Sequence, residues 1–431
     1  MSLLVLTLLA LASYVSTAPK SEPTATGCYL NYLGNGDQTP LFLNSSGVFP
    51  DPISYDTAMV FFNKYEHLYV ACPNVDTIES NYPLVPDGEE ATCVGETTIH
   101  AITSNKTLDF YSMNCNQKFR PYFYEHFTSE KCEFGFTVQY IGHLIARQFV
   151  PVIKLCFDKA QIVPIYSKYI TNRWSAQFVY YNPNIDFDYV SNSLFDDLVP
   201  WDVYAKTKQT MKNLGVFGYI TNDVYLLPGQ LAAYDDFLSL HQRDLTFDYA
   251  NAPFQWNTIN KGNWKSMVSS IQKLITEKID LGDVTILSGT LRIASLPNKG
   301  GRPVELFLSG DGRMPVPGWF WKLMIARSPQ FAVVFFVYNN PYVEKSIVDE
   351  EFKTICKDNV LETFNWVTGI DNTNPKAGFT YACFVGRDYM VDETMREIVN
   401  NALEETNIQS NWLEIPSVSV GEAVKASQKS K

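Results

Sequence analysis

The chain has 431 residues, 46% of them hydrophobic and 14% aromatic, so it can bury the core of one large domain or two. This composition excludes a disordered chain, which would be poorer in apolar residues. The formal net charge of −12 argues against a protein that wraps nucleic acid by bulk positive charge.

The first 18 residues have the pattern of a secretory signal peptide. Their apolar run, residues 3–11, is too short to span a bilayer, and small residues near the end of the segment suit cleavage. A buried N-terminal strand is the alternative interpretation. Glycosylation sequons that begin at Asn44 and Asn105 agree with an extracellular route. We therefore expect a secreted glycoprotein.

Eight cysteines in a secreted chain indicate disulfides. No two of them are two to four residues apart, which excludes a zinc-binding pattern. The spacing leaves the pairing open. We expect near neighbours to pair, such as Cys93 with Cys115 and Cys356 with Cys383.

The N-terminal part of the chain predicts a small β-rich region. Residues 19–27 are rich in Pro, Ser and Thr, which is typical of a disordered segment. Beyond them, short apolar runs bounded by Gly, Pro and Asn predict strands at 57–62, 67–72 and 97–102. We assign residues 19–130 to this disulfide-tied region.

From about residue 131 the runs become longer and a few helices appear. Alternation and apolar runs predict strands at 135–141, 149–158, 284–290 and 333–338, and residues 200–213 have a helical pattern. The pattern alone supports an α+β fold with one large domain.

The stretch from Asn251 to Trp264 is rich in amides, poor in charge and leads into a helix. Apolar residues then recur at helical offsets, at Trp264, Met267, Val268, Ile271, Leu274, Ile275 and Ile279. We place Asn260 just before this helix, where the first backbone N–H groups lack partners and the dipole is positive. A polar loop there can hold phosphate, or a hydrated cation that bridges to phosphate.

This stretch resembles the DNA/RNA non-specific endonuclease family. The likeness rests on Asn251, on Gln255 two residues after a proline, and on Asn260 in an Asn-x-Gly-x-Trp cluster. Further likenesses extend over roughly residues 131–390, and they resemble secreted insect members, including fly salivary proteins with degenerate sites. The resemblance implies an α+β fold for residues 131–431, with a mixed sheet and a ββα-metal nuclease core, and it implies Asn260 as the ligand of Mg²⁺.

The resemblance fails at the catalytic centre. The family's histidine stands in an Arg-Gly-His segment, and the matching segment here is Pro228-Gly229-Gln230. An amide has no pKa near neutral pH, and loss of a positioned base typically costs about 10²–10⁴ in rate. Pro228 removes a guanidinium that would stabilise charge on the transferring phosphoryl group. A carboxylate that the family often has near the metal falls here on Val268.

Each remaining site residue has a structural alternative. Asn260 suits a metal ligand, but Asn is also a common helix cap. Asn251 and Gln255 match residues that order the metal-bound water in the family, and we predict that both contact nucleic acid. They equally suit loop amides. His143 lies in a Gly-His-Leu segment that mimics the catalytic one, yet it stands far from Asn260 in the sequence; His241 has the pattern of an exposed turn residue.

Lysines near the site are candidates for contacts to nucleic-acid phosphates. Residues 201–330 hold 14 Lys and Arg against 11 Asp and Glu, although the whole chain is acidic. Among the candidates, Lys261 and Lys265 bracket the helix start, and Lys206 and Lys208 lie on the helix predicted upstream. Solvated helix faces are the alternative interpretation for each of them.

These observations lead to three functional hypotheses. The first is a secreted protein that binds DNA or RNA without sequence preference and cleaves it weakly or not at all. The second is a working Mg²⁺-dependent endonuclease in which Gln230 only orients the attacking water. The third is a secreted interaction protein that uses the old fold for a protein partner, in keeping with a pI near 5.0.

Overall fold

The computed structural model describes most of the chain from residue 26 to residue 407. The described ranges are 26–32, 39–53, 57–72, 88–113, 115, 124–146, 148–175, 189–278, 281–328, 330–386 and 389–407. The expected signal peptide, residues 1–18, and most of the segment 19–27 lie outside them. No helix among the described residues is long and apolar enough to cross a membrane.

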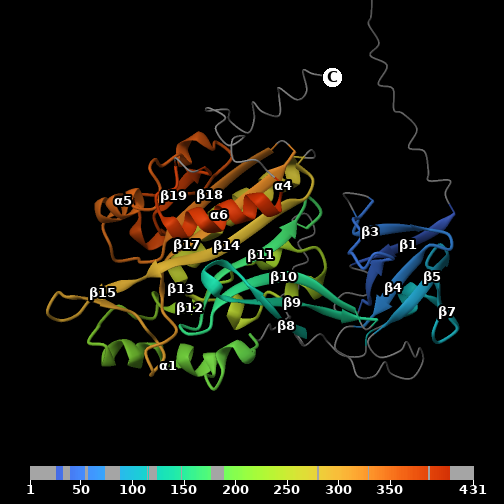
Figure 1. The fold of residues 1–431 in the computed structure, drawn as a ribbon, viewed down its shortest axis with the longest axis horizontal. Coiled ribbons are helices and arrows are strands. Elements are labelled where there is room, and N and C mark those ends of the chain that lie inside the picture. Colours follow the sequence, from blue (N-terminus) through green and yellow to red (C-terminus); the bar gives the residue numbers. More distant parts are fainter. Residues whose placement is uncertain are drawn as a thin grey trace, which may run out of the picture.

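The N-terminal region is a small β structure beside the main body (Figure 1). Strand β1 (Gly27–Asn31) pairs with β3 (Met59–Asn63). A second sheet has the order β2-β4-β5-β6-β7 and contains Leu41–Asn44, His67–Ala71, Glu89–Gly95, Thr98–Ala101 and Lys106–Asp109. The three strands that the sequence predicted here are confirmed as β3, β4 and β6.

Two disulfides tie this region together, and one expected pair is wrong. Cys93 bonds to Cys28, and Cys115 bonds to Cys72, so the expected Cys93–Cys115 pair does not form. The reason is that β1 lies against the end of β5, where the backbone N–H of Tyr29 donates to the carbonyl oxygen of Glu96 and the N–H of Glu96 donates to that of Gly27. Cys356–Cys383 is confirmed, and Cys132–Cys156 completes the set.

The main body is built on one eight-stranded sheet with the order β19-β18-β17-β14-β11-β10-β9-β8. Its strands, in chain order, are Tyr124–Lys131, Thr137–Ile145, Gln148–Asp158, Val163–Thr171, Val284–Ile293, Pro317–Arg327, Gln330–Tyr338 and Thr380–Phe384. Every described pair in it is antiparallel, where the prediction had a mixed sheet, because most neighbours are joined by short hairpin connections. The predicted α+β class is confirmed.

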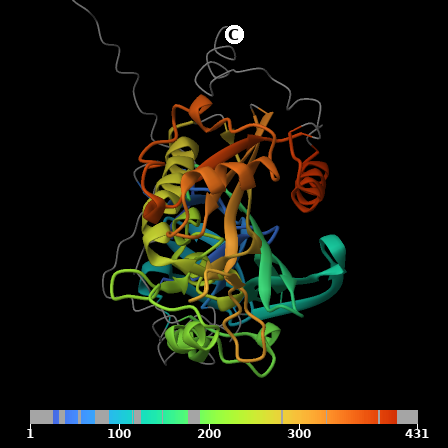
Figure 2. The ribbon, with the colours of Figure 1, turned by 90° about the vertical axis from the view of Figure 1, so that its left-hand side faces the viewer.

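Helices cover both faces of this sheet. Helix α4 (Lys265–Glu277) packs on one face, whereas α5 (Lys345–Lys353) and α6 (Glu393–Glu405) cover the other (Figure 2). Alternate residues of the central strands therefore enter two separate cores: Phe320 and Met324 face α4, and Trp321 and Leu323 face α6. Burial on both faces explains the uninterrupted apolar runs in the sequence.

A buried ion pair fixes the segment around residue 236 to the sheet. Lys322 Nζ on β17 lies 3.1 Å from Asp236 Oδ2, and the two side chains are 0% and 2% exposed. Tyr169 donates a 2.5 Å hydrogen bond to the same carboxylate oxygen, and Gln272 of α4 donates to the other at 2.9 Å. Buried charges require such partners, because removing each ion from water costs several kcal/mol (order of magnitude). This cluster therefore joins two strands, α4 and the turn Tyr234–Asp236.

The N-terminal region contacts the main body through a buried pair of histidines. His241, in α2 (Leu240–Asp244), hydrogen-bonds through Nε2 to the carbonyl oxygen of Thr39 at 2.8 Å. The ring of His143 on β9 lies 6.3 Å from the ring of His241. Both residues are buried, so the expectation that His241 is an exposed turn residue is wrong. The fold brings residue 39 over it, which local sequence does not reveal.

Removal of Lys322 should test the buried ion pair. Since breaking a buried pair by deleting one partner costs about 3–5 kcal/mol, we expect Lys322→Ala to lower the free energy of unfolding by a similar amount in urea denaturation. Lys353→Ala removes a partner from the exposed Lys353–Glu350 pair and is the matched control, with no shift of the midpoint expected. Equal losses in both variants would contradict a special role for the buried pair.

The histidine pair should make the fold sensitive to acid. Burial lowers the pKa of His241 to about 4 and that of His143 to about 3, from an ordinary value of 6.5. Below pH 6.5 the unfolded chain gains protons that the folded protein does not bind. Its free energy of unfolding should therefore fall towards pH 4 by about 1.4 kcal/mol per pH unit for each histidine.

Denaturation between pH 7 and pH 5 measures this slope. The double variant His143→Gln/His241→Gln should flatten it, whereas His100→Gln, at a half-buried position on β6 of the N-terminal sheet, should not. A double variant with the slope of the wild type would show that other groups carry the acid sensitivity.

Candidate functional site

The amide-rich stretch folds into a hairpin followed by a helix. Strand β12 (Leu226–Pro228) pairs with β13 (Phe254–Trp256), and the chain continues through α3 (Asn257–Ile259), a π-helical turn (Asn260–Trp264) and α4. This is the two-strand-and-helix unit that the resemblance implied. The described apolar residues from Trp264 to Ile275 that we expected on one helix face are all buried.

The helix begins earlier than the sequence predicted. Asn257 starts it, and Asn260 has helical φ and ψ of −55° and −46°, so Asn260 lies one turn inside rather than in a preceding loop. The interruption comes at Gly262, which departs from helical geometry with φ −91° and ψ −125°. A Cβ at Gly262 would lie 2.8 Å from the backbone of Ala377, so only glycine allows this approach.

Asn260 and Gln255 form the centre of the candidate site. Asn260 Nδ2 donates a 2.7 Å hydrogen bond to Gln255 Oε1, and this half-buried amide makes no hydrogen bond through Oδ1 to the part of the chain that the structure describes. Gln255 is 0% exposed, and its Nε2 finds no acceptor among the described residues. A buried N–H without an acceptor favours an oxygen-bearing ligand or water beside it.

Asn251 joins the segment that follows β12 to the segment that precedes β13. It is 0% exposed, and its side chain accepts hydrogen bonds from Ala232 N at 2.9 Å and Ser167 Oγ at 2.7 Å. Its Nδ2 donates to the carbonyl oxygens of Ala232 and Thr246. Since every polar atom of this amide is used inside the protein, the predicted direct contact of Asn251 with nucleic acid does not fit its position. It is a positioning residue.

Gln230 lies where the chain leaves β12. Its Nε2 donates to Thr246 Oγ1 at 2.9 Å. The preceding Gly229 packs against Gln255, because a Cβ at Gly229 would lie 2.5 Å from Gln255 Oε1. The structure thus brings Gly229 against Gln255, and Gln255 against Asn260.

The carboxylate that the family often has is missing here. Val268 is 8% exposed and belongs to the apolar face of α4 that packs on the sheet. A different carboxylate, Asp235, lies on the segment after Gln230. Burial raises the pKa of Asp235, while the positive charges of Arg243 and Lys265 oppose this shift. Sequence reasoning missed Asp235, whose only signal was its place five residues after Gln230.

The candidate lysines divide into two groups. Lys261 and Lys265 are exposed on the first turns of the helix, near Asn260. Lys206 and Lys208 are exposed on α1 (Pro200–Asn213), which lies on the other side of the hairpin from α4 (Figure 1). Helix α1 contacts the hairpin unit through Tyr204, whose hydroxyl donates to the carbonyl oxygen of Ala252 at 2.8 Å. The four lysines therefore do not form one cluster.

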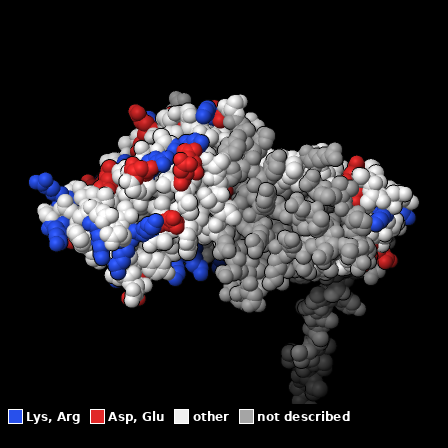
Figure 3. Space-filling view, turned by 90° about the horizontal axis from the view of Figure 1, so that it is seen from below, with Lys and Arg blue, Asp and Glu red and all other residues white. Residues whose placement is uncertain are grey.

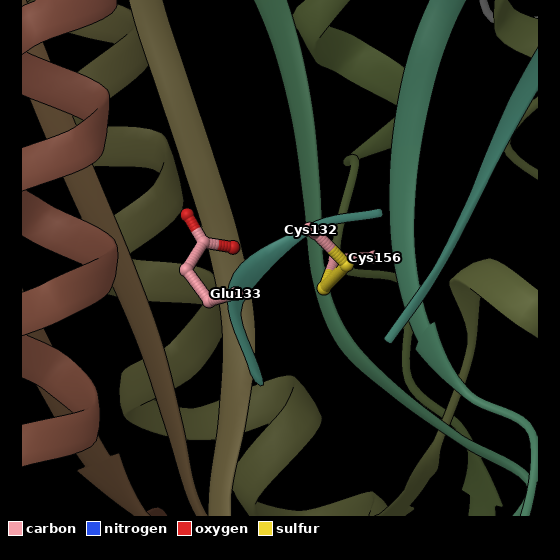
Figure 4. Close-up of side chains that lie close together, drawn as sticks. All are labelled: Cys132, Glu133 and Cys156. Carbon is pink, nitrogen blue, oxygen red and sulfur yellow. A yellow bond between two sulfur atoms is a disulfide. The ribbon is translucent and has the colours of Figure 1, made fainter. Parts of the chain in front are cut away.

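A separate group of side chains has the spacing of a metal site but not its chemistry. Cys132, Glu133 and Cys156 are the group of this kind found among the described residues (Figure 4). The two sulfurs are bonded to each other, so neither is a thiolate ligand. Glu133 accepts hydrogen bonds from Tyr166 at 2.8 Å and from Asn401 at 3.2 Å. We therefore assign this group a structural role.

Comparison with known proteins places the site in context. A sequence profile of the DNA/RNA non-specific endonuclease family matches residues 132–388. A protein named salivary endonuclease, from Lutzomyia longipalpis, is 27% identical over 402 residues that cover 89% of this chain and 88% of that protein. Salivary protein Tsal1, from Glossina morsitans morsitans, is 28% identical over 258 residues that cover 56% of this chain and 63% of that protein.

One solved structure, of the EndoG/EndoGI complex, contains a chain that is 16% identical to this one. The alignment covers 45% of this chain and 74% of that chain, with a TM-score of 0.32.

Two variants should distinguish the buried positioning role of Asn251 from the partly exposed role of Asn260. Asn251→Ala leaves several buried groups without partners, each of which costs about 1–3 kcal/mol, so we expect a loss of more than about 3 kcal/mol in free energy of unfolding. Asn260→Ala removes one partly exposed hydrogen bond and should cost about 1 kcal/mol or less. Urea denaturation measures both values. Similar losses in the two variants would contradict the roles assigned to these residues.

Proposed function

Because this chain belongs to the DNA/RNA non-specific endonuclease family, we propose that it is a secreted protein that binds DNA or RNA through backbone phosphates. Binding has no sequence preference, and cleavage is weak or absent. The observation that carries this proposal is Gln230, an amide in the place of the family's histidine on an otherwise preserved hairpin-and-helix unit.

Gln230 can orient a phosphate or a water molecule, but it cannot accept a proton from the attacking water. Gln230 is bound through its amide nitrogen to Thr246, and neither end of an amide titrates near neutral pH. His143 and His241 cannot substitute, since both are buried and engaged at the contact with the N-terminal region. Pro228, at the end of β12, offers no positive charge to a transferring phosphoryl group.

Magnesium fits this site as a weakly held ion. Asn260 Oδ1 is a neutral oxygen in a half-buried position, and Mg²⁺ accepts one protein oxygen when water and substrate phosphate supply the rest. When bound, the ion would supply positive charge at the phosphate. Val268 offers no support to it, so affinity without nucleic acid should be low.

Contacts to phosphate would come from the exposed lysines and from Gln255. Lys261 and Lys265 follow Asn260 on the helix, and Nε2 of Gln255, which finds no acceptor among the described residues, is a further donor on the residue that Asn260 contacts. We assign residues 131–431 to this nuclease-like domain and residues 19–130 to the β-rich region, although β8 (Tyr124–Lys131), which begins before residue 131, pairs with β9 in the central sheet.

Secretion rests on three independent features. The apolar run within residues 1–18 has signal-peptide character. The described cysteines are all disulfide-bonded, which is typical of an oxidising compartment. Both relatives with substantial coverage carry salivary names.

A working Mg²⁺-dependent endonuclease is the second candidate function. It is favoured by the name of the Lutzomyia longipalpis relative, which aligns over 88% of its own length. In that case Gln230 would only orient the attacking water. A secreted protein that binds a protein partner is the third, in keeping with the acidic pI of about 5.0.

Restoring the histidine is the decisive experiment. In Gln230→His, the carbonyl oxygen of Thr246, now 3.3 Å from Gln230 Nε2, can hold one ring N–H and leave the other nitrogen to accept a proton. We expect plasmid cleavage in the presence of Mg²⁺ to rise by about 10²-fold or more over the wild type. Gln209→His, on the exposed face of α1, is the matched control and should not change the rate.

Binding is measured separately by fluorescence anisotropy over a range of salt concentrations. Wild-type affinity should fall steeply as salt rises, because phosphate binding releases counterions. Wild-type cleavage already at the rate of Gln230→His would favour the active enzyme. No binding at low salt would overturn the proposal and favour a protein partner.

A further inference from the structure

A surface next to the β12–β13 hairpin carries exposed aromatic rings together with cations. It comprises Phe217, Tyr219, Lys299, Arg302 and Tyr342, which we call the aromatic–basic surface. These residues come from three places: the segment after α1, the turn between β15 (Ser295–Pro297) and β16 (Pro303–Glu305), and the loop after β18. None of them belongs to the site described above.

Ring contacts link this surface to the β12–β13 hairpin. The rings of Tyr219 and Tyr342 lie 4.9 Å apart at 74°, and the ring of Tyr342 lies 5.5 Å from the ring of Trp256. Trp256 follows Gln255 on β13. Tyr219 also donates a hydrogen bond to the carbonyl oxygen of Pro297, which joins the segment to the β15–β16 hairpin. The surface is therefore anchored to the unit that carries the candidate site.

Phe217 is held out of the core by its backbone. It lies between Gly215 and Gly218, whose positive φ values of 78° and 84° suit glycine and turn the chain sharply on each side. The ring is 45% exposed, and the ammonium of Lys299 lies 5.0 Å from its centroid. Tyr342 is 38% exposed. An exposed phenylalanine fixed beside a lysine offers a free aromatic face next to a positive charge.

Positive charge surrounds these rings. Figure 3 shows Lys and Arg side chains gathered at the end of the molecule that carries the β15–β16 hairpin and α1. Lys299 and Arg302 are exposed in the turn of that hairpin, and Lys208 and Lys212 are exposed on α1. Among the residues that the structure describes, no ion pair involves any of these four cations.

We propose that the aromatic–basic surface is a subsite for single-stranded nucleic acid, on which bases stack against Phe217 and Tyr342 while Lys299 and Arg302 bind phosphates. This inference rests on the nucleic-acid binding proposed above and adds the substrate class. Aromatic faces can stack only on bases that are unpaired, and they do so without sequence preference. A duplex would still contact the cations but not the rings.

The chemistry favours nucleic acid over a protein partner at this surface. Cations placed among aromatic rings match a nucleic acid, because the cations can bind its phosphates and the rings can stack on its flat bases.

Fluorescence anisotropy with labelled oligonucleotides tests the proposal. Wild-type full-length protein is titrated with a single-stranded thymidine oligomer and with a duplex of the same length. Phe217→Ala should weaken binding of the single strand by about 5- to 150-fold, since stacking of one base is worth that factor, and should leave duplex binding unchanged. Lys299→Ala should weaken both and reduce the salt slope for the single strand by about 0.7.

Tyr65→Ala is the matched control. Tyr65 is 70% exposed with Lys64 5.2 Å from its ring, so it is an equivalent ring–cation pair on the N-terminal region. This variant should bind both oligonucleotides as the wild type does. Because Phe217 is half-exposed, Phe217→Ala should keep the wild-type thermal midpoint, which shows that any loss of binding is local.

The outcomes separate this inference from the proposed function. If the wild type binds both oligonucleotides and Phe217→Ala binds the single strand as tightly, the aromatic subsite is overturned while nucleic-acid binding stands. Equal weakening of single strand and duplex by Phe217→Ala also overturns stacking. If the wild type binds neither oligonucleotide at low salt, the proposed function fails and the subsite fails with it.

Discussion

The buried ion pair between Lys322 and Asp236 is the constraint on which the position of the candidate site depends. Two charges removed from water need each other and further hydrogen bonds, which Tyr169 and Gln272 supply. The segment from Gln230 to Asp236 is thereby joined to the centre of the sheet and to α4. Asn251 then ties the start of this segment to the chain that leads into β13. These two attachments fix the positions of the residues of the candidate site.

This arrangement separates the scaffold of the site from its chemistry. The groups that build the scaffold are buried and fully bonded, as in Asn251 and in Asn339, which bridges β13 to the start of β17. Gln230, Pro228 and Val268 stand where the family resemblance implies a histidine, an arginine and a carboxylate, and Val268 is itself buried in the core. A fold can keep a phosphate-binding geometry after losing a proton acceptor, because the two depend on different residues.

Charge is distributed in a way that agrees with this division. The whole chain carries −12, yet lysines and arginines gather near α1 and the β15–β16 hairpin (Figure 3). Local potential rather than net charge governs the approach of a polyanion, since fields from exposed charges decay over about 10 Å at moderate salt. An acidic protein can therefore present a basic surface to nucleic acid at one end.

The sequence by itself determined the α+β class, the apolar face of α4 and most central strands. These features depend on periodicity and on spacing within short segments, which the chain carries locally. Tertiary structure alone decided the partner of Cys93, the burial of Asn251 and His241, and the start of the helix at Asn257. Each of these depends on which distant segment packs there: β1 against β5, Thr39 over His241, Ala377 against Gly262. Packing between segments far apart in sequence leaves no periodic signal, so it becomes visible only when the chain is folded.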